Sequence, residues 1–330
     1  MKILVTGGLG FIGSNFISKL LKESNEFEVV NVDAELYGAD RRNLSEIQNH
    51  EKYEFIKGNI TNKRLMEETI SRCDLVVNFA AESFVDRSIS DANPFLVSNI
   101  RGAFTVLDII TKQKKRMLQI STDEVFGSLL SNTATEESKL NPSSPYAATK
   151  AAAELLINSY CVTYDSDVII TRCTNNYGPR QFPEKLIPKT IILAKQGQNI
   201  PIYGNGENIR DWIHVDDHCN GILSLLLDGK SGQSYNISAN NEMDNVTIVK
   251  MILEIMGKSE DLIEHVEDRP GHDFRYSMDS KKITSELNWK TKLSFDKGLE
   301  KTIQWYLDNP EIINNLSTTV LDPTPWKNSN

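Results

Sequence analysis

The chain has 330 residues, of which 39% are hydrophobic and 25% are charged, and its formal net charge is −9. This composition indicates a folded globular protein of about two lobes and excludes a disordered chain. The acidic charge argues against a nucleic-acid partner, because non-specific attraction to phosphates needs a basic face.

Short apolar runs alternate with helical patterns over residues 1–178. Strands of continuous apolarity separated by helices are typical of a parallel sheet that helices cover on both faces. The sequence therefore predicts an α/β fold with a doubly wound parallel (Rossmann) sheet. The expected strands are KILVTG, EVVNVD, YEFIKGNI, DLVVNFAA, RMLQIST and DVIITRCTN, and the expected helices are FIGSNFISKLLKE, one around Asn99 to Thr111 and one from Pro145.

The pattern becomes irregular after residue 178, with clusters of Pro, Gly and Asn at Asn175 to Pro188 and at Pro201 to Asn208. Such clusters are expected where a chain crosses between lobes. We expect a discontinuous arrangement: a Rossmann domain from residues 1–178 plus 209–238, a smaller substrate lobe from 179–208 plus 239–318, and a loose tail from 319–330.

The turn after the first strand, TGGLGFIG, contains glycines at positions 7, 10 and 13. Glycines there allow a tight turn and a close approach of the backbone to a pyrophosphate, which lies at the positive end of the next helix. The second strand ends in Asp33, whose carboxylate can accept hydrogen bonds from the ribose of a dinucleotide. Asp33 would repel a ribose phosphate, so NAD is favoured over NADP. Arg41 and Arg42 could instead pair with such a phosphate, but a solvated helix start is the simpler interpretation.

The two acids of STDEV follow the apolar strand RMLQI directly. Ligands of an open parallel sheet bind beyond the carboxyl ends of its strands, so a strand ending at Ser121 can offer Thr122, Asp123 and Glu124 to one pocket. Neighbouring carboxyl groups in a dry pocket do not readily both ionise, which provides one acid and one base for eliminating water. The alternative is that Asp123 or Glu124 caps the following turn.

The segment SPYAATKAAAELL predicts a helix with Ser144 as its cap and Pro145 in its first turn. Tyr146 and Lys150 are four residues apart and share a face of this helix. A nearby ammonium can lower the pKa of the phenol from about 10 toward neutrality, so that it accepts a proton from an alcohol. An isolated YxxxK would more often be ordinary helix surface, whereas a dinucleotide-binding turn in the same chain favours catalysis.

TGGLGFIG together with YAATK resembles the extended short-chain dehydrogenase/reductase family, whose members act largely on nucleotide sugars. Five further segments are similar, in order and spacing, to the dTDP-glucose 4,6-dehydratases of that family, and the resemblance covers nearly all of the chain except the tail. It implies an NAD-dependent lyase that forms a homodimer and acts on a nucleotide sugar. The segments are AAESFVDRSI, STDEVFG, RCTNNYGPRQFPEKLIP, YGNGENIRDWIHVDDHC and DRPGHDFRY.

The resemblance also implies a mechanism in three stages. Tyr146, helped by Lys150 and Thr122, removes the proton of the sugar 4-hydroxyl while hydride passes from C4 to NAD⁺. Glu124 then abstracts the C5 proton as Asp123 protonates the 6-hydroxyl, which leaves as water. Hydride finally returns to C6, which gives a 4-keto-6-deoxy sugar and leaves the cofactor as it began.

The same resemblance assigns binding residues. The cofactor set is Gly7, Gly10, Phe11, Ile12, Gly13, Asp33, Ala34, Leu36, Asn59, Ile60, Phe79, Ala80, Ala81, Ser83, Ser98, Tyr146, Lys150 and Asn176. The substrate set is Ser83, Thr122, Asn175, Lys185, Leu186, Pro201, Ile202, Tyr203, Arg210, Asn245, Arg269 and His272. Three positions depart from the family: Phe84 stands in place of His, Phe126 in place of Tyr, and Asn59 in place of an acid near the adenine. Asn59 still offers a carbonyl acceptor, so we expect NAD binding to survive.

Several alternatives stay open. A dehydratase of a UDP- or CDP-linked sugar is hard to distinguish, whereas a 4-epimerase needs no acid–base pair and a decarboxylase usually has Ser at position 123. A non-catalytic NAD-binding protein is disfavoured by the intact catalytic set. The four cysteines have no CxxC spacing and the five histidines no metal spacing, so we expect reduced thiols and no metal. No apolar run reaches the ~20 residues of a membrane span, and MKILVTGG is too short for a secretory signal, so we expect a cytoplasmic protein.

Overall fold

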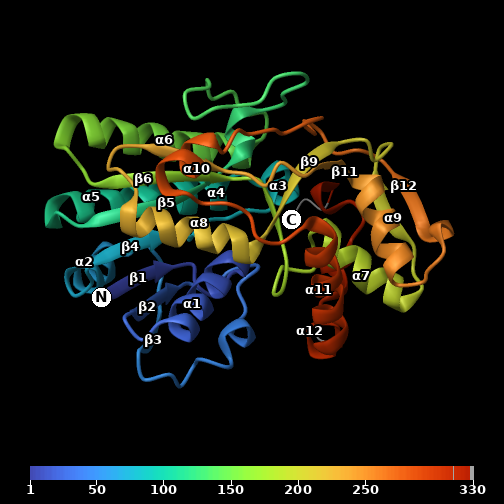
Figure 1. The fold of residues 1–330 in the computed structure, drawn as a ribbon, viewed down its shortest axis with the longest axis horizontal. Helices are drawn as coiled ribbons and strands as arrows, with labels where there is room; N and C mark the ends of the chain where they lie inside the picture. The colour runs from blue at the N-terminus through green and yellow to red at the C-terminus, as the bar shows by residue number, and fades with distance from the viewer. Residues whose placement is uncertain (315, 328–330) are drawn as a thin grey trace.

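The computed structural model describes residues 1–314 and 316–327, which form a large and a small lobe (Figure 1). The large lobe contains a seven-stranded sheet in the order β10–β6–β5–β4–β1–β2–β3, and every neighbouring pair is parallel. This confirms the doubly wound parallel sheet. Its strands are β1 (Lys2–Thr6), β2 (Glu28–Asp33), β3 (Tyr53–Lys57), β4 (Leu75–Asn78), β5 (Arg116–Thr122), β6 (Val168–Cys173) and β10 (Ser234–Ile237).

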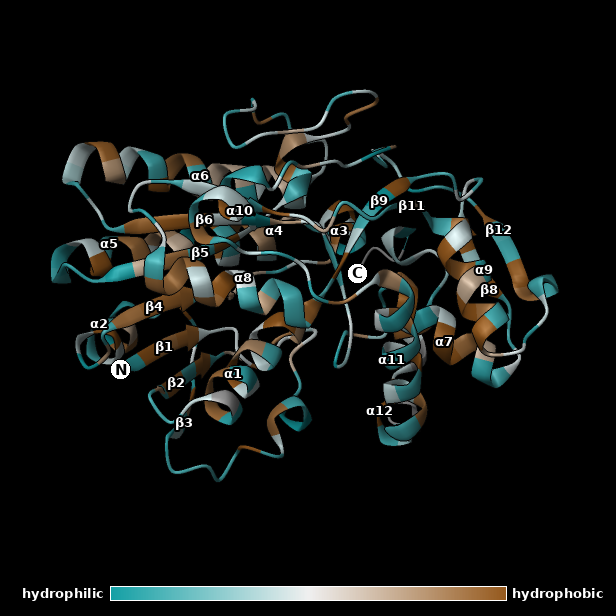
Figure 2. Ribbon diagram, in the orientation of Figure 1, coloured by the Kyte–Doolittle hydropathy of each residue, from teal (hydrophilic) through white to brown (hydrophobic). Residues whose placement is uncertain are grey.

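Helices cover both faces of the sheet because its central strands are apolar on both sides, as the brown strands in Figure 2 show. In β1, Ile3 and Val5 join one core and Leu4 joins the other, as the alternation of side chains along a strand requires. The helices on the first face are α1 (Phe11–Glu23), α8 (Val215–Asp228) and α10 (Lys281–Leu287), and those on the second are α2 (Lys63–Ser71), α5 (Ala103–Gln113) and α6 (Pro145–Tyr164).

The helix expected around Asn99 to Thr111 is longer than predicted. It begins as α4 (Asn93–Phe95), widens into a π-helical stretch (Leu96–Gly102) and continues as α5. Such stretches are rare and often lie at functional sites. This one contains Asn99, whose side-chain amide pairs with both backbone groups of Glu82, at 2.9 and 3.0 Å. The wide turn therefore anchors the loop that follows β4.

The small lobe is built from segments that are separated in the sequence. A three-stranded sheet, a parallel strand pair and four helices pack around Ile187, Ile191, Ile252 and Leu299. The predicted Rossmann segment 209–238 contains β9, α8 and β10. Of these, β9 pairs with β7 and β11 in the small lobe, whereas α8 and β10 join the large lobe. The domain boundaries drawn from the sequence stay a prediction. The elements are β7 (Asn175–Tyr177), β9 (Ile209–His214), β11 (Glu242–Asp244), β8 (Ile200–Tyr203), β12 (Ile263–Val266), α7 (Leu186–Gln196), α9 (Asn245–Ile255), α11 (Phe295–Asp308) and α12 (Pro310–Asn314).

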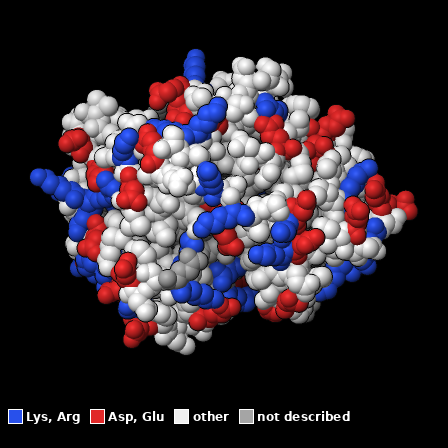
Figure 3. Space-filling view, in the orientation of Figure 1, with Lys and Arg blue, Asp and Glu red and all other residues white. Residues whose placement is uncertain are grey.

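Short helices complete the described chain. The helix α3 (Val85–Ser90) lies where the two lobes meet (Figure 1). On the face drawn in Figure 3, acidic and basic side chains are intermingled. Within the described part of the chain, no helix is both long and apolar enough to cross a membrane. The 3₁₀ helices are Arg41–Leu44, Asp123–Phe126, Glu260–Leu262, Thr318–Leu321 and Pro325–Lys327.

The expectation of a loose tail is wrong for residues 319–327, while residues 328–330 lie outside the described ranges. Val320 and Trp326 are only 5% and 7% exposed. The hydroxyl of Ser90 donates to the carbonyl of Trp326 at 3.0 Å, and Lys189 Nζ donates to the carbonyl of Asp322 at 3.0 Å. The segment packs because it carries apolar side chains among its prolines.

Candidate active site

Two adjoining cavities lie beyond the carboxyl ends of the strands, where an open parallel sheet binds its ligands. The first cavity is lined by the glycine turn, the ends of β2, β4 and β5, and the start of α6. The second cavity lies between α3 and the small lobe. Both are lined by Phe84, Glu124, Asn175 and Lys185, so they meet at the predicted acid–base pair.

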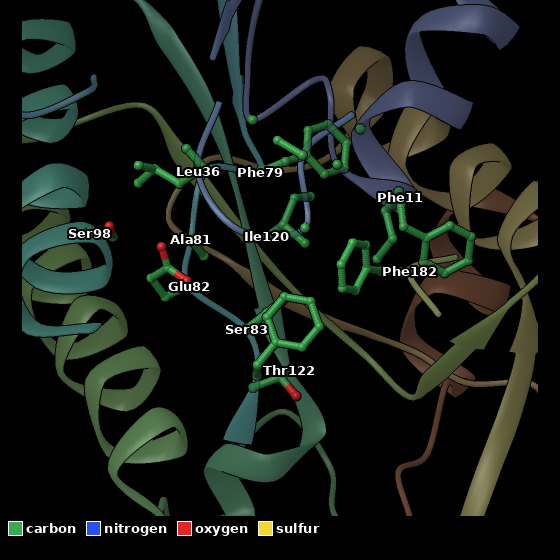
Figure 4. A pocket seen from close by; sticks show the side chains of 18 of the residues that line it. Phe11, Leu36, Phe79, Ala81, Glu82, Ser83, Ser98, Ile120, Thr122 and Phe182 are labelled. Atoms are coloured by element: carbon green, nitrogen blue, oxygen red, sulfur yellow. The ribbon is translucent and has the colours of Figure 1, made fainter. Parts of the chain in front are cut away.

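The structure brings together every binding residue expected from the sequence. All members of the cofactor set line the first cavity. In Figure 4, Ser83 and Thr122 lie at the end of that cavity away from Leu36 and Phe79. The substrate set lines the second cavity, apart from Ser83 and Thr122, which line the first.

The glycine turn between β1 and α1 packs so closely against the chain's own backbone that a side chain would not fit at two of its positions. Gly7 has a φ of +69°, and a Cβ there would lie 2.6 Å from the backbone nitrogen of Ala80. A Cβ on Gly13 would lie 2.5 Å from the carbonyl oxygen of Gly7. No side chain caps α1 at Gly10, so the amide groups of its first turn stay available to a ligand. The turn therefore fits a pyrophosphate at the helix N-terminus.

Asp33 ends β2 and is 6% exposed. Its carboxylate accepts hydrogen bonds from the backbone of Leu9 at 2.9 Å and of Glu35 at 2.8 Å. A carboxylate has about four acceptor positions, so roughly two remain for ribose hydroxyls. Arg41, one alternative partner for a ribose phosphate, pairs with Glu35 instead, and Arg42 pairs with the acid two positions before it. These contacts favour a cofactor that lacks the ribose phosphate.

The three departures from the family differ in their surroundings. The carbonyl of Asn59 accepts from the backbone and the hydroxyl of Thr61, at 2.9 and 2.8 Å, while Asn59 lines the first cavity, so its part in cofactor binding stays a prediction. Phe84 is buried between the two cavities, and Lys185 Nζ lies 4.7 Å from its ring centre. Phe126 lines neither cavity. Of the two Phe departures, only Phe84 is therefore placed to touch a ligand.

The acid pair lies on a sharp bend, because β5 ends at Thr122 and the 3₁₀ helix Asp123–Phe126 follows at once. The hydroxyl of Thr122 accepts from the backbone of Glu124 at 3.3 Å and donates to Asp123 at 3.1 Å. Thr122, and neither acid, therefore caps this turn. Asp123 Oδ2 and Glu124 Oε2 are buried and have no hydrogen-bond partner among the described residues. Both oxygens are free to meet a ligand.

The surroundings separate the two acids electrostatically. Burial raises the pKa of Asp123 well above its usual range, and repulsion by Glu124 adds to the rise. Burial also raises the pKa of Glu124, but the positive charges of Arg269, Lys185 and Arg210 oppose it. Asp123 is therefore the group that more readily keeps a proton, and Glu124 the one that stays charged. The arrangement can provide one acid and one base.

Tyr146 and Lys150 both face the first cavity from α6. Ser144 caps this helix as expected, accepting from the backbone of Ala147 at 3.1 Å. The expected fall in the pKa of Tyr146 is wrong for the protein alone: burial raises that pKa well above 10, and Glu124 adds to the rise. Burial also lowers the pKa of Lys150 to about 8, while its Nζ donates to a backbone carbonyl at 2.6 Å. Desolvation thus outweighs the attraction between ammonium and phenolate.

The second cavity is lined by four basic side chains, Lys185, Lys189, Arg210 and Arg269, and by three acids. Arg210 donates to the carbonyl of Asp273 at 2.9 Å, and its guanidinium lies 4.3 Å from the ring centre of Tyr276. Arg269 Nη1 donates to Asp86 at 2.8 Å, while its Nε is buried with no partner among the described residues. A pyrophosphate is the kind of anion that such a pair of arginines can hold.

Several residues that line the cavities were not predicted from the sequence, among them Tyr37, Asp86, Glu184 and Tyr276. Asp86 and Tyr276 line the second cavity. Both lie in segments that carry the family resemblance, but the sequence did not show that their side chains face the cavity. Tyr37 donates to Glu184, and the guanidinium of Arg87 lies 3.5 Å from the ring centre of Tyr37. This contact joins three distant parts of the chain. No local sequence pattern could have found it.

Two histidines expected to be structural have clear partners. His218 is fully buried, its Nδ1 lies 2.8 Å from Asn176 Oδ1, and burial lowers its pKa to about 3. It therefore holds the side chain of Asn176 as a neutral ring. His214 accepts from the backbone of Asp216 at 3.2 Å at the start of α8. In the described ranges, no group of three or more His, Cys, Asp or Glu side chains could hold a metal ion.

Comparison with known proteins gives consistent matches. The family model described as GDP-mannose 4,6 dehydratase matches residues 4–302. The low-salt glycan biosynthesis protein Agl12 of Haloferax volcanii is 47% identical over 94% of this chain and 100% of its own length. A dTDP-glucose 4,6-dehydratase of Streptomyces niveus is 43% identical over 94% of each chain. The crystal structure of the dTDP-glucose 4,6-dehydratase of Bacillus anthracis in complex with NAD matches with a TM-score of 0.89 at 43% identity, over 94% of this chain and 98% of that one.

Proposed function

Because this chain belongs to the GDP-mannose 4,6-dehydratase family, we propose that it is a dTDP-glucose 4,6-dehydratase, which converts dTDP-glucose to dTDP-4-keto-6-deoxyglucose and water. The observation that carries the proposal is the pair Asp123 and Glu124, buried where the two cavities meet, each with one oxygen that no described residue hydrogen-bonds. Elimination of water needs an acid and a base on one substrate. An epimerase would not need this pair.

The cofactor is NAD, and it fits the first cavity. The glycine turn can cradle its pyrophosphate, Asp33 keeps acceptor positions for its ribose, and both support the assignment. A bound NAD would supply reversible hydride exchange with C4 and C6 of the sugar. The chain's own residues bind the two ligands and move the protons.

Tyr146 is the proposed base for the proton of the sugar 4-hydroxyl. In the protein alone it rests as a neutral phenol, because burial raises its pKa. Lys150 lies on the same helix, and a bound cofactor would bring the positively charged nicotinamide ring into the first cavity. Both positive charges would favour loss of the phenol proton. Thr122 lines the same cavity, and its hydroxyl acts to lower the pKa of Tyr146 against the effect of burial.

Glu124 and Asp123 are proposed to divide the elimination between them. Glu124, held charged by nearby cations, takes the proton from C5, and Asp123, which keeps its own proton more readily, gives one to the 6-hydroxyl. The C6–O bond breaks and water leaves; Glu124 then returns its proton to C5 as hydride reaches C6, and Asp123 regains a proton, which balances the one that Tyr146 took from the 4-hydroxyl. Arg210, Arg269 and Lys185 are proposed to hold the nucleotide end of the substrate in the second cavity.

Offering purified protein dTDP-, UDP- and CDP-glucose in separate reactions tests the function. We expect dTDP-glucose to lose the mass of one water without net formation of reduced cofactor, and the other two nucleotide sugars to react more slowly. Conversion without a change in mass would identify an epimerase and contradict the proposal. Faster dehydration of UDP- or CDP-glucose would keep the reaction and change the substrate.

We also propose a homodimer formed through α5 and α6. Their outer faces carry large apolar side chains at spacings that place them together: Phe104 is 40%, Leu155 61% and Val162 89% exposed. Exposed apolar faces of this kind are typical of protein–protein interfaces. A second copy of the same helix pair would cover them as a four-helix bundle. The cytoplasm is the proposed location, since none of the four described cysteines forms a disulfide, as in a reducing compartment.

Replacing Leu155 and Val162 together with Glu should convert the dimer to a monomer of 37.2 kDa in sedimentation or light-scattering measurements. The two new carboxylates of each subunit would be buried in the contact, where water cannot solvate them, and this cost opposes association. The matched control is Leu227→Glu, an exposed leucine (47%) on α8 in the opposite helix layer, which should leave the assembly unchanged. A dimer that survives the double change would place the interface elsewhere.

A further inference from the structure

The C-terminal segment, residues 316–327, supports the second cavity from outside. None of its residues lines either cavity. Its end lies close to α3 in Figure 1, and its short 3₁₀ helix Pro325–Lys327 packs against that helix. The segment therefore has no direct contact with a ligand. Its effects must pass through the residues that it touches.

Trp326 begins a chain of contacts that ends at a ligand-facing guanidinium. Its ring meets Tyr203 edge-on, with centres 4.7 Å apart and an angle of 85°. Tyr203 Oη donates to Asp86 Oδ2 at 2.9 Å, and Asp86 Oδ1 accepts from Arg269 Nη1 at 2.8 Å. Arg269 lines the second cavity, and its Nε has no hydrogen-bond partner in the described part of the chain. The position of Trp326 thus helps to fix the donors that Arg269 presents.

Other anchors tie the same segment to three different parts of the cavity wall. Ser90 on α3 donates to the carbonyl of Trp326, and Lys189 on α7 donates to that of Asp322. Lys327 pairs with Glu267 at 2.6 Å, two residues before Arg269 in the loop after β12. The segment therefore holds α3, α7 and this loop together. These are the elements that supply Asp86, Leu186 and Arg269 to the cavity.

We propose that Trp326 is a positioning residue for the nucleoside diphosphate part of the substrate. By docking against Tyr203 it holds Asp86 and Arg269 in the geometry that binds the nucleotide. Its link to the acid–base pair is indirect, because Arg269 also helps to keep Glu124 charged, an effect that Lys185 and Arg210 share. This inference rests on the proposed function for the identity of the ligand.

The test compares Trp326→Ala with the unchanged NAD-bound protein. An aromatic pair of this kind accounts for about a tenfold change in affinity at most. We expect the KM for dTDP-glucose and the Kd for dTDP, measured by calorimetry, to rise by about three- to tenfold, with kcat changed less than about twofold and bound NAD unchanged. Trp326→Phe should recover most of the affinity because it restores the ring edge.

Two further variants separate positioning from loss of fold. Tyr203→Phe keeps the ring contact but removes the hydroxyl that bonds Asp86, so it should raise the Kd for dTDP with little change in unfolding temperature. Trp305→Ala is the control, since Trp305 is a half-buried tryptophan of α11 that contacts Tyr306 and lines neither cavity. It should lower the unfolding temperature and leave the Kd for dTDP unchanged.

The proposal is overturned if Trp326→Ala binds dTDP as the unchanged protein does, or if kcat and bound NAD fall together with affinity. The second result would mean a purely structural role. Failure of the proposed function looks different, because the unchanged protein would then dehydrate none of the nucleotide sugars. The calorimetric comparison with dTDP would still decide the role of Trp326.

Discussion

Glu124→Gln should oxidise its substrate but not complete the reaction. The amide cannot take the C5 proton, so the 4-keto sugar stays in the site and the cofactor stays reduced. Loss of a general base typically costs about 100- to 10,000-fold, and we expect product formation to fall by that order. Rapid mixing with dTDP-glucose should show reduced nicotinamide absorbance that rises to one equivalent per active site and decays very slowly.

The matched control for this variant is Glu137→Gln, an exposed acid on the loop after the acid–base pair. It should turn over like the unchanged protein, with no accumulated reduced cofactor. Full turnover by Glu124→Gln would remove Glu124 from the proposed role. Loss of both absorbance and product would instead assign it to the first step.

Tyr146→Phe should block the reaction before the cofactor is reduced. The ring stays in place on α6, so NAD should remain bound, but no phenol is present to accept the proton of the 4-hydroxyl. We expect product formation to fall by about 100- to 10,000-fold, with no transient absorbance of reduced nicotinamide. The absence of that signal distinguishes this variant from Glu124→Gln.

Tyr164→Phe serves as the control, because Tyr164 ends the same helix and is 59% exposed. It should keep full activity. The Kd for dTDP should be unchanged in both tyrosine variants. If Tyr146→Phe still accumulated reduced cofactor, another group would have to be the base of the first step.

The large lobe could be predicted because its strands are uniformly apolar. In a parallel sheet the carboxyl ends of neighbouring strands converge, so motifs after β1, β2 and β5 were bound to meet at one edge. Local sequence patterns were therefore enough to predict that Asp33 and Glu124 line the same cavity. The strand β10 was missed, since SYNI is short and half polar.

The rest depended on packing between distant parts of the chain. The pairing of Tyr37 with Glu184 joins residues 147 positions apart, and the docking of Trp326 on Tyr203 has no local signal. The pKa of Tyr146 was misjudged because sequence spacing shows which charges are near but not how much water is excluded. Burial decided the sign of that shift.

The shared wall of the two cavities bears on how the protein could be inhibited. A ligand in the first cavity and one in the second would both border Phe84, Glu124, Asn175 and Lys185, which line both cavities. Two separate ligands each lose translational freedom when they bind. A compound that joined a nucleoside diphosphate to a nicotinamide mimic through a short linker would lose this freedom only once. Such a tethered ligand should bind far more tightly than either half, by the effective concentration that its linker imposes.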